Sequence, residues 1–488
     1  MSVVTATGAA GVHVAQPRLR GFLSQPDEVD DAPVRVEGTL PRWLAGDYLL
    51  NGPAIFDFGH GQFGHWFDGL AKLHRLHIDA AGVRYRSRLL QTEALRASRA
   101  ADRPSLGGFD TPDDVGLFGR LAALRNPRRT DNAAVVMSRC GRQWLALTET
   151  DRVARFDPAT LATQGELVWA DGPKLPVQAA HPCIDGRGRW WNVGVEFGRI
   201  CHYVLYSSGG DGRREIRARI PVARPGYLHA FAVTARRAVI WECAWRAHPL
   251  RFLFSGESYA KHFDWLPEGG SRLHAVDLAD GSVRSWAAPA LMVFHAAQAF
   301  DRGDDVVLDL CVSDITIVDD LSLAARREGR PMRAPQAAHR RFVLSAGRGD
   351  ALDQPLPGRF DLAMADPTVA GAREATVVWG AGARDDTPDA FFNRTVRVDL
   401  ATGEVTGRAR DDAVMLEPLF VARPGGAENE GVLLVPTLAD GDAGTVIEVL
   451  DAGTLDPRAA LHLPTIVPFG FHAAFEPADP THRALPVN

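Results

Sequence analysis

The sequence lacks the long apolar runs and the paired cysteines that mark membrane proteins and disulfide scaffolds. No stretch of about 18 uncharged apolar residues occurs, so no segment is expected to span a bilayer as a helix. Residues 1–16 have neither the basic start nor the apolar run of a signal peptide. The five cysteines are odd in number, widely spaced and without a CxxC pair, which indicates buried thiols in a reducing compartment. These absences predict a soluble, cytoplasmic protein.

A basic surface and an internal linker are also missing. The 54 Lys and Arg residues are outnumbered by 60 Asp and Glu residues, for a formal net charge of −6, whereas nucleic-acid-binding domains are basic. No Pro/Ser-rich linker, charge block or low-complexity stretch divides the 488 residues. This length would on average hold about three domains, but closed all-β folds often exceed the usual domain size. We expect an N-terminal extension over residues 1–37 and a single domain with cap insertions over 38–488. We expect neither nucleic acid nor an obligate protein as partner.

What the sequence does contain is a repeated pattern of apolar runs joined by Asp and Gly turns. Clear examples are residues 73–85, 273–283, 396–405 and 449–455. Alternating apolar residues on both sides of such a turn predict β-hairpins. Hairpins repeated over hundreds of residues indicate an all-β sandwich array or a propeller. The repeats are too uneven to count blades. Helical patterns are few, at 112–125 and 319–327.

Four of the sixteen histidines stand in short, apolar, strand-like runs: His181, His229, His295 and His472. A buried imidazole needs a partner, because an unpaired buried polar group costs on the order of 1–3 kcal/mol. One shared solution is a metal ion bound by neutral imidazole nitrogens. The spacings match no zinc finger and no HExxH helix, so these residues can meet only in a closed, radial fold. A single such histidine is more often a core residue bonded to a backbone carbonyl, and spacing alone does not decide between the two.

Other blocks of sequence accompany these histidines. Residues 46–53 read GDYLLNGP, 65–71 read HWFDGLA, 85–93 read YRSRLLQTE and 130–133 read TDNA. Together with the contexts of the four histidines, and in this order, they resemble the carotenoid cleavage oxygenase family from about residue 38 to 477. The blocks at 85–93 and 130–133 resemble in particular its β-carotene oxygenase and retinoid isomerase branch. Many motifs in register are far more specific than any one of them.

The resemblance implies a fold and a ligand set. The fold would be a seven-bladed β-propeller with a small cap of helices and loops over one face, and the four histidines would hold one Fe(II) ion. In the family, three acidic residues accept the second ring N–H of three histidines, which fixes the tautomer and orientation of each ring. Matched residue by residue, these are Glu149 behind His229, Asp361 behind His295 and Glu417 behind His472. Taken alone, Glu149 and Glu417 would be interpreted as solvated carboxylates at strand ends.

Two of the matched positions leave a choice open. Asp361 stands where the family usually has glutamate, and its side chain is one methylene shorter. It would reach His295 through a water molecule or from a shifted strand. Thr148 aligns with a family residue whose side chain crowds one open position of the iron, which would make it a catalytic residue. The alternative for Thr148, an ordinary β-branched strand residue, is equally consistent with the sequence.

The resemblance also implies a reaction. With O₂ as co-substrate, Fe(II) would cleave a conjugated C=C bond of a carotenoid or apocarotenoid to two carbonyl products. The alternatives are cleavage of a stilbene or phenylpropanoid alkene, retinoid isomerisation at the same iron, and a metal-free propeller that serves as a binding scaffold. Stilbene-cleaving relatives recognise a phenol with a tyrosine and a lysine, and residues 95–98 and 128–132 show no such pair. We therefore expect an apolar polyene as substrate.

A polyene is found in membranes, so the mouth of its tunnel is expected to contact a membrane peripherally. Within residues 115–125 an apolar stripe recurs at helical spacing, with arginines nearby: Leu117, Phe118, Leu121 and Leu124. This pattern suits an interfacial helix. Packing of the same stripe against the propeller is the alternative, and it is the commoner use of such a pattern.

Overall fold

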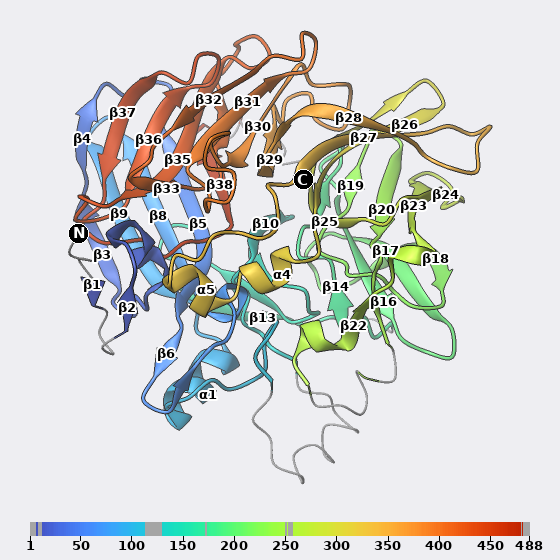
Figure 1. Cartoon of the computed structure of the whole chain (residues 1–488), viewed down its shortest axis with the longest axis horizontal. Helices are drawn as coiled ribbons and strands as arrows, with labels where there is room; N and C mark the ends of the chain where they lie inside the picture. Colours follow the sequence, from blue (N-terminus) through green and yellow to red (C-terminus); the bar gives the residue numbers. More distant parts are fainter. Residues whose placement is uncertain are drawn as a thin grey trace.

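Seven sheets surround a central axis in the computed structural model, which describes residues 6–7, 12–112, 129–170, 173–248, 251, 257–479 and 481. Figure 1 shows them as the blades of a propeller, viewed close to the axis. Each blade is an antiparallel sheet of four to six strands. The predicted all-β, seven-bladed propeller is confirmed.

Blades 2 to 6 are each formed by one stretch of chain. Blade 2 consists of β10 (Val136–Cys140), β11 (Gln143–Leu147), β12 (Val153–Phe156) and β13 (Thr163–Leu167). Blade 3 consists of β14 (Val177–Gln178), β15 (Cys183–Ile184), β16 (Trp190–Glu196), β17 (Cys201–Ser208) and β18 (Glu215–Val222). Blade 4 consists of β19 (Ala232–Val233), β20 (Arg237–Glu242), β23 (Ser271–Asp277) and β24 (Val283–Ala288). Blade 5 consists of β25 (Met292–Arg302), β26 (Asp305–Ser313), β27 (Ala338–Leu344) and β28 (Leu352–Arg359). Blade 6 consists of β29 (Asp361–Ala365), β30 (Val377–Gly382), β31 (Arg394–Asp399) and β32 (Val405–Ala409).

Blades 1 and 7 combine strands from both ends of the chain and so close the ring. Blade 1 consists of β3 (Val29–Pro33), β9 (Gly82–Leu89), β8 (Leu70–Asp79), β5 (Gly46–Ile55) and β38 (His472–Pro477). Blade 7 consists of β33 (Ala413–Met415), β34 (Leu419–Ala422), β35 (Gly431–Ala439), β36 (Val446–Asp451), β37 (Pro457–His462) and β4 (Arg35–Gly38). Both β3 and most of β4 lie within residues 1–37, where an N-terminal extension was expected, and both pair with strands of the blades.

The hairpin turns explain why the sequence pattern gives this fold. The four predicted hairpins correspond to β8–β9, β23–β24, β31–β32 and β36–β37. At the first turn, the Asp79 carboxylate accepts the N–H groups of Ala81 and Gly82, and Gly82 has φ +132°. Asp399 accepts from Ala401 and Thr402 in the same way. An aspartate that binds the following backbone fixes each reversal, together with a glycine at positive φ in the first three turns (Gly82, Gly281 and Gly403) and with Leu455 at φ +64° in the fourth.

Short helices and strands lie outside the seven blades. The helices are α1 (Glu93–Ala101), α4 (Ile317–Asp320), α5 (Leu323–Arg327), η1 (Pro17–Phe22), η2 (Trp66–Asp68), η3 (Tyr259–His262) and η4 (Pro267–Gly269). The additional short strands are β1 (Ala6–Thr7), β2 (His13–Val14), β6 (Asp57–Phe58), β7 (Gly61–Gln62), β21 (Trp245–Ala247) and β22 (Phe263–Trp265). Figure 1 shows α4 and α5 crossing in front of the centre of the ring. None of the helices in the described ranges is long and apolar enough to cross a bilayer.

The predicted helix at 319–327 is two helices. The helical conformation is interrupted where Ser322 forms a β-bridge with His65, and α5 begins at the next residue. The buried Arg327 then anchors α5, because its guanidinium binds both carboxylate oxygens of Asp57 and its Nε donates to the Phe22 carbonyl. The predicted helix at 112–125 lies outside the described residues apart from Pro112.

Candidate metal centre

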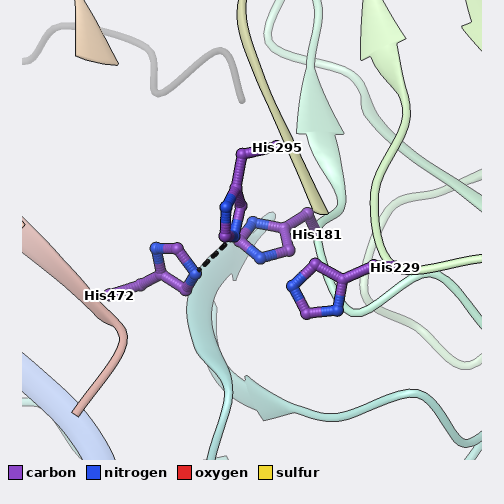
Figure 2. A group of neighbouring side chains, drawn as sticks. All are labelled: His181, His229, His295 and His472. Carbon is purple, nitrogen blue, oxygen red and sulfur yellow. Dashed lines mark hydrogen bonds between the residues drawn. The ribbon is translucent and has the colours of Figure 1, made fainter. Parts of the chain in front are cut away.

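The four predicted histidines meet near the axis from four different blades. His181 follows β14, His229 precedes β19, His295 lies on β25 and His472 is the first residue of β38. One ring nitrogen from each lies within 4.8 Å of the others. Figure 2 shows the four rings converging on one point. The radial fold therefore brings together residues that are far apart in the sequence.

Three of the four rings are held from behind by a carboxylate. The Nδ1 of His229 donates to Glu149 Oε1, that of His295 to Asp361 Oδ1 and that of His472 to Glu417 Oε1, each at 2.8 Å. His181 has no such carboxylate among the hydrogen bonds of the described residues. Its backbone N–H instead binds the His229 carbonyl at 3.3 Å. The structure thus pairs each of the three acidic residues with the histidine that the resemblance implied.

These hydrogen bonds determine which nitrogen of each ring is free to bind a metal. Because each Nδ1–H is directed at a carboxylate, the Nε2 atom of the same ring carries a lone pair; this tautomer is assigned from the hydrogen-bond pattern. The Nε2 atoms of His295 and His472 face one another at 3.2 Å, the dashed line in Figure 2. The Nε2 of His181 is buried and has no hydrogen-bond partner within the described part of the chain. Facing lone pairs and an orphaned buried nitrogen are unfavourable unless a cation lies between them.

Asp361 reaches His295 directly, from a displaced strand. The register between β29 and β30 shifts between Asp361 and Met364, and Leu362 has φ +49°. On the neighbouring strand, a Cβ atom at Gly380 would lie 2.9 Å from the Asp361 carbonyl and 2.4 Å from the Phe360 ring. The absence of a side chain at Gly380 therefore lets this backbone approach, and the displacement makes up for the missing methylene.

Glu417 and Glu149 stand in different electrostatic environments. Burial raises the pKa of Glu417 to about 8, against the effect of the Ala473 N–H that binds its second oxygen. Burial also lowers the pKa of His472 well below its usual value, which keeps its imidazole neutral and able to offer a ring nitrogen to a metal. Burial acts on Glu149 in the same direction, but hydrogen bonds from His229 and Tyr227 outweigh it and lower the pKa of Glu149.

Thr148 lies beside the site with its hydroxyl directed at the neighbouring carboxylate. Its Oγ1 donates to Glu149 Oε2 at 3.2 Å, and the residue is buried. The contact joins Thr148 to the His229–Glu149 pair. Crowding of an open metal position by Thr148 stays a prediction.

Tyr227 is a site residue that the sequence analysis missed. Its hydroxyl donates to Glu149 Oε1 at 2.9 Å and lies 3.3 Å from His229 Nδ1. The signal was present, because residues two apart in an extended run point to the same side. Tyr227 belongs to a packed cluster of buried and half-buried aromatic side chains beside the histidines, which we call the aromatic chamber: Phe67, Phe109, Tyr227, Trp245, Tyr259, Phe263 and Phe294. Phe294 packs edge-on against the His229 ring, with 5.3 Å between centroids.

The stripe predicted to contact a membrane lies in 113–128, outside the described residues: Leu117, Phe118, Leu121 and Leu124. Peripheral membrane contact therefore stays a prediction.

Comparison with known proteins places this site in a family. Residues 22–477 match the family model described as retinal pigment epithelial membrane protein. The chain is 32% identical to carotenoid cleavage dioxygenase 8 homolog A, chloroplastic, of Oryza sativa subsp. japonica, over 91% of this chain and 85% of that protein. It is 26% identical to the human mitochondrial carotenoid-cleaving dioxygenase, over 92% of this chain and 90% of that protein.

Solved structures agree on the fold. The crystal structure of cobalt-substituted Synechocystis ACO superimposes with a TM-score of 0.84 at 24% identity, over 95% of this chain and 98% of that chain. A likeness at this identity supports the architecture alone, whereas the family model and the rice relative cover the sequence itself. The chain therefore belongs to the carotenoid cleavage oxygenase family.

Proposed function

We propose that this protein is a non-haem Fe(II) dioxygenase that cleaves a C=C bond of a carotenoid or apocarotenoid to two carbonyl products. The observation that carries the proposal is the convergence of one ring nitrogen from each of the four histidines, with three Nδ1 atoms held by carboxylates. The names of the relatives, which describe carotenoid cleavage, support the substrate class.

The residues present fit a metal ion. Two nitrogens bound to one ion at about 2.1 Å can be no more than about 4.2 Å apart. The four nitrogens lie within 4.8 Å of one another, so movements of about half an ångström would bring all of them to bonding distance. His181, His229, His295 and His472 would then hold Fe(II). When bound with open positions, the iron would supply the activation of O₂ beside an electron-rich alkene.

The chain's own residues would orient the ligands and exclude water. Glu149, Asp361 and Glu417 keep each Nδ1 protonated, which leaves Nε2 free to bind the metal. The aromatic chamber is an apolar cluster beside His229, and a polyene docked against it would gain roughly 25 cal/mol for each Å² of apolar area that it buries. A long polyene should therefore bind more tightly than a short aromatic alkene.

Location is a separate expectation. The relatives compared above include chloroplastic and mitochondrial proteins. The cytoplasmic location predicted from the sequence stays a prediction, which fractionation of the producing cell would test.

One experiment separates the proposed function from its alternatives. Iron-loaded protein is incubated under ¹⁸O₂ with a panel of carotenoids, apocarotenoids, stilbenes and retinyl esters, and the products are analysed by chromatography and mass spectrometry. We expect ¹⁸O-labelled carbonyl products from a polyene. Turnover of stilbenes alone, or isomerisation without incorporation of ¹⁸O, would overturn the proposal.

A further inference from the structure

A small cavity lies between blades 1 and 7, against the outer side of the His472–Glu417 pair. It is bordered by β5, β35, the start of β38 and the loop before β38. The cavity offers about 20 Å³ to the centre of a water-sized sphere, and about 10–15 Å³ is enough for one water molecule. It therefore has room for one or two very small molecules and none for a polyene.

The wall of this cavity is almost entirely apolar. The side chains that border it include Leu50, Leu438, Val467, Phe469 and Phe471. Each of these side chains is buried. A site of this kind offers dispersion contacts and little else.

Most of the polar groups on the wall are already engaged, and His74, which also borders the cavity, has its Nδ1 2.7 Å from the Tyr85 hydroxyl. Both carboxylate oxygens of Glu417 accept hydrogen bonds, from His472 Nδ1 and the Ala473 N–H. Thr445 Oγ1 accepts the N–H of Val467 at 2.8 Å, and Thr437 Oγ1 donates to the Val435 carbonyl at 3.3 Å. These bonds leave few groups for a molecule inside the cavity.

One buried acceptor on the wall has no partner in the described ranges, namely Asn51 Oδ1, while Asn51 Nδ2 donates to the Ala133 carbonyl at 2.8 Å. A stably bound internal water makes two to four hydrogen bonds. A single acceptor is therefore too little to hold one, and apolar cavities of this kind stay dry and bind apolar atoms such as xenon.

We propose that this cavity is a docking site for an apolar diatomic gas and that it supplies dioxygen to the metal centre. The supply role rests on the proposed function, whereas the docking of a gas does not. Dioxygen has no hydrogen-bonding requirement and is small enough for the space. The cavity borders His472, one of the four converging histidines, so a molecule docked there lies beside the centre.

The cavity and the aromatic chamber reach the histidines from different sides. The chamber contacts His229 through Phe294, and the cavity contacts His472. Phe471 stands between them, since it borders the cavity and packs against Phe67 of the chamber with 5.2 Å between centroids. A bound polyene would therefore leave the gas site open, and the two substrates would not compete for one entrance.

The first test is a crystal of the iron-loaded protein under xenon pressure. We expect a xenon peak in the cavity beside Leu50, Leu438 and Phe469. Thr437→Ile extends an apolar side chain into the space and gives up only the bond to Val435, so this variant should lose the peak. Val378→Ile adds bulk to the fully buried core of β30, away from the cavity, and should keep it.

The second test measures steady-state cleavage at varied O₂ with a saturating polyene. Thr437→Ile should raise the KM for O₂ severalfold, with the KM for the polyene and the iron content unchanged; Val378→Ile should match the natural protein in all three. Ordered water in place of xenon would overturn the docking site. A displaced xenon with an unaltered KM for O₂ would overturn the supply role. Absence of any cleavage by the iron-loaded natural protein would contradict the proposed function, while the xenon crystal would still decide on the cavity.

Discussion

The pairs His472–Glu417 and His295–Asp361 reach the same geometry by different means. Glu417 binds His472 Nδ1 with one oxygen and the Ala473 N–H with the other, at 2.8 and 2.7 Å. Asp361 uses Oδ1 for both of its bonds, to His295 Nδ1 at 2.8 Å and to the Leu362 N–H at 2.9 Å. The Glu417 pair is 4% and 5% exposed, and the Asp361 pair 12% and 14%.

A displaced backbone can therefore compensate for a shorter side chain, at a cost in free energy. A left-handed conformation at a residue such as Leu362 costs on the order of 1–2 kcal/mol, and the surrounding sheet must maintain it. Glu417 needs no such adjustment and ties the first residues of β38 to the site. We therefore expect the Glu417 pair to contribute more to the metal centre than the Asp361 pair.

The largest effect on iron binding is expected when a histidine ring is removed. His472→Ala and His295→Ala each remove a proposed ligand, so both should lose turnover and most of the bound iron, whatever stands behind the ring. Iron per chain is measured after anaerobic purification with excess Fe(II). The control is His339→Gln, which changes a buried histidine bonded to the Pro357 carbonyl and should keep the metal. Negligible iron in the natural protein under these conditions would contradict the metal centre.

A smaller effect, which should differ between the two pairs, is expected when each carboxylate is replaced by the corresponding amide. In Glu417→Gln the amide must present its NH₂ group either to His472 Nδ1–H or to the Ala473 N–H, so two donors face each other. In Asp361→Asn the oxygen can keep both bonds and the NH₂ group takes the other position. Loss of an outer partner typically costs about 10–100-fold in metal affinity or activity. Glu417→Gln should fall in this range, and Asp361→Asn below it.

Fe(II) dissociation constants from competition with a chelator measure this difference. The unfolding midpoints of both metal-free variants show whether the fold is retained. Equal losses in the two variants would remove the distinction between the pairs.

The displaced strand can be tested on its own. Asp361→Glu should lower iron retention, because the backbone is already shifted toward His295 and a longer arm would push the ring. Gly380→Ala should act in the same direction, since the new methyl group would meet Phe360 at 2.4 Å and overpacking of this kind costs roughly 1–3 kcal/mol. Gly186→Ala, where no atom lies within 4 Å of the added carbon, is the control. Higher iron retention in Asp361→Glu would instead show that the aspartate is a compromise.

The displacement of β29 at Leu362 could not be predicted from the sequence, whereas the hairpins could. The Asp/Gly turns predicted four hairpins correctly because each turn is fixed by neighbouring residues, as at Asp79 and Gly82. The number of blades and the identity of the acidic partners came from the resemblance. The shift at Leu362 depends on Gly380 in the next strand, and the sequence around Leu362 does not indicate that Gly380 lies close to it.

Helix α1 was missed for a different reason. Its stretch of alanines and arginines buries only Ala94, Leu95 and Ser98, so the apolar stripe is too thin to recognise. Its start depends on Thr92, whose side chain accepts the Leu95 N–H, and on Asp131, whose carboxylate accepts the N–H groups of Glu93 and Ala94. The second of these contacts comes from a distant part of the chain.

The smallest effect is expected at the third pair, His229–Glu149, which shares its carboxylate with Tyr227. Tyr227→Phe removes one donor to Glu149 Oε1 and keeps the ring in the aromatic chamber. A hydrogen bond to a charged group contributes about 1.5–3 kcal/mol and a neutral one about 0.5–1.5 kcal/mol. Thr148 and His229 still bind Glu149, so the free energy lost should lie toward the lower end of these ranges, and Fe(II) binding should weaken severalfold.

Tyr85→Phe is the matched control for this last variant, because Tyr85 is equally buried and its hydroxyl also binds a histidine ring nitrogen, that of His74. It should leave Fe(II) affinity unchanged. If Tyr227→Phe binds Fe(II) as tightly as the natural protein but has a raised KM for the polyene, Tyr227 acts as a wall of the chamber alone. If the Fe(II) dissociation constant and the KM for the polyene both rise, the Tyr227 hydroxyl positions Glu149. The His229–Glu149 pair would then depend on Tyr227, just as the His295–Asp361 pair depends on the displaced strand β29.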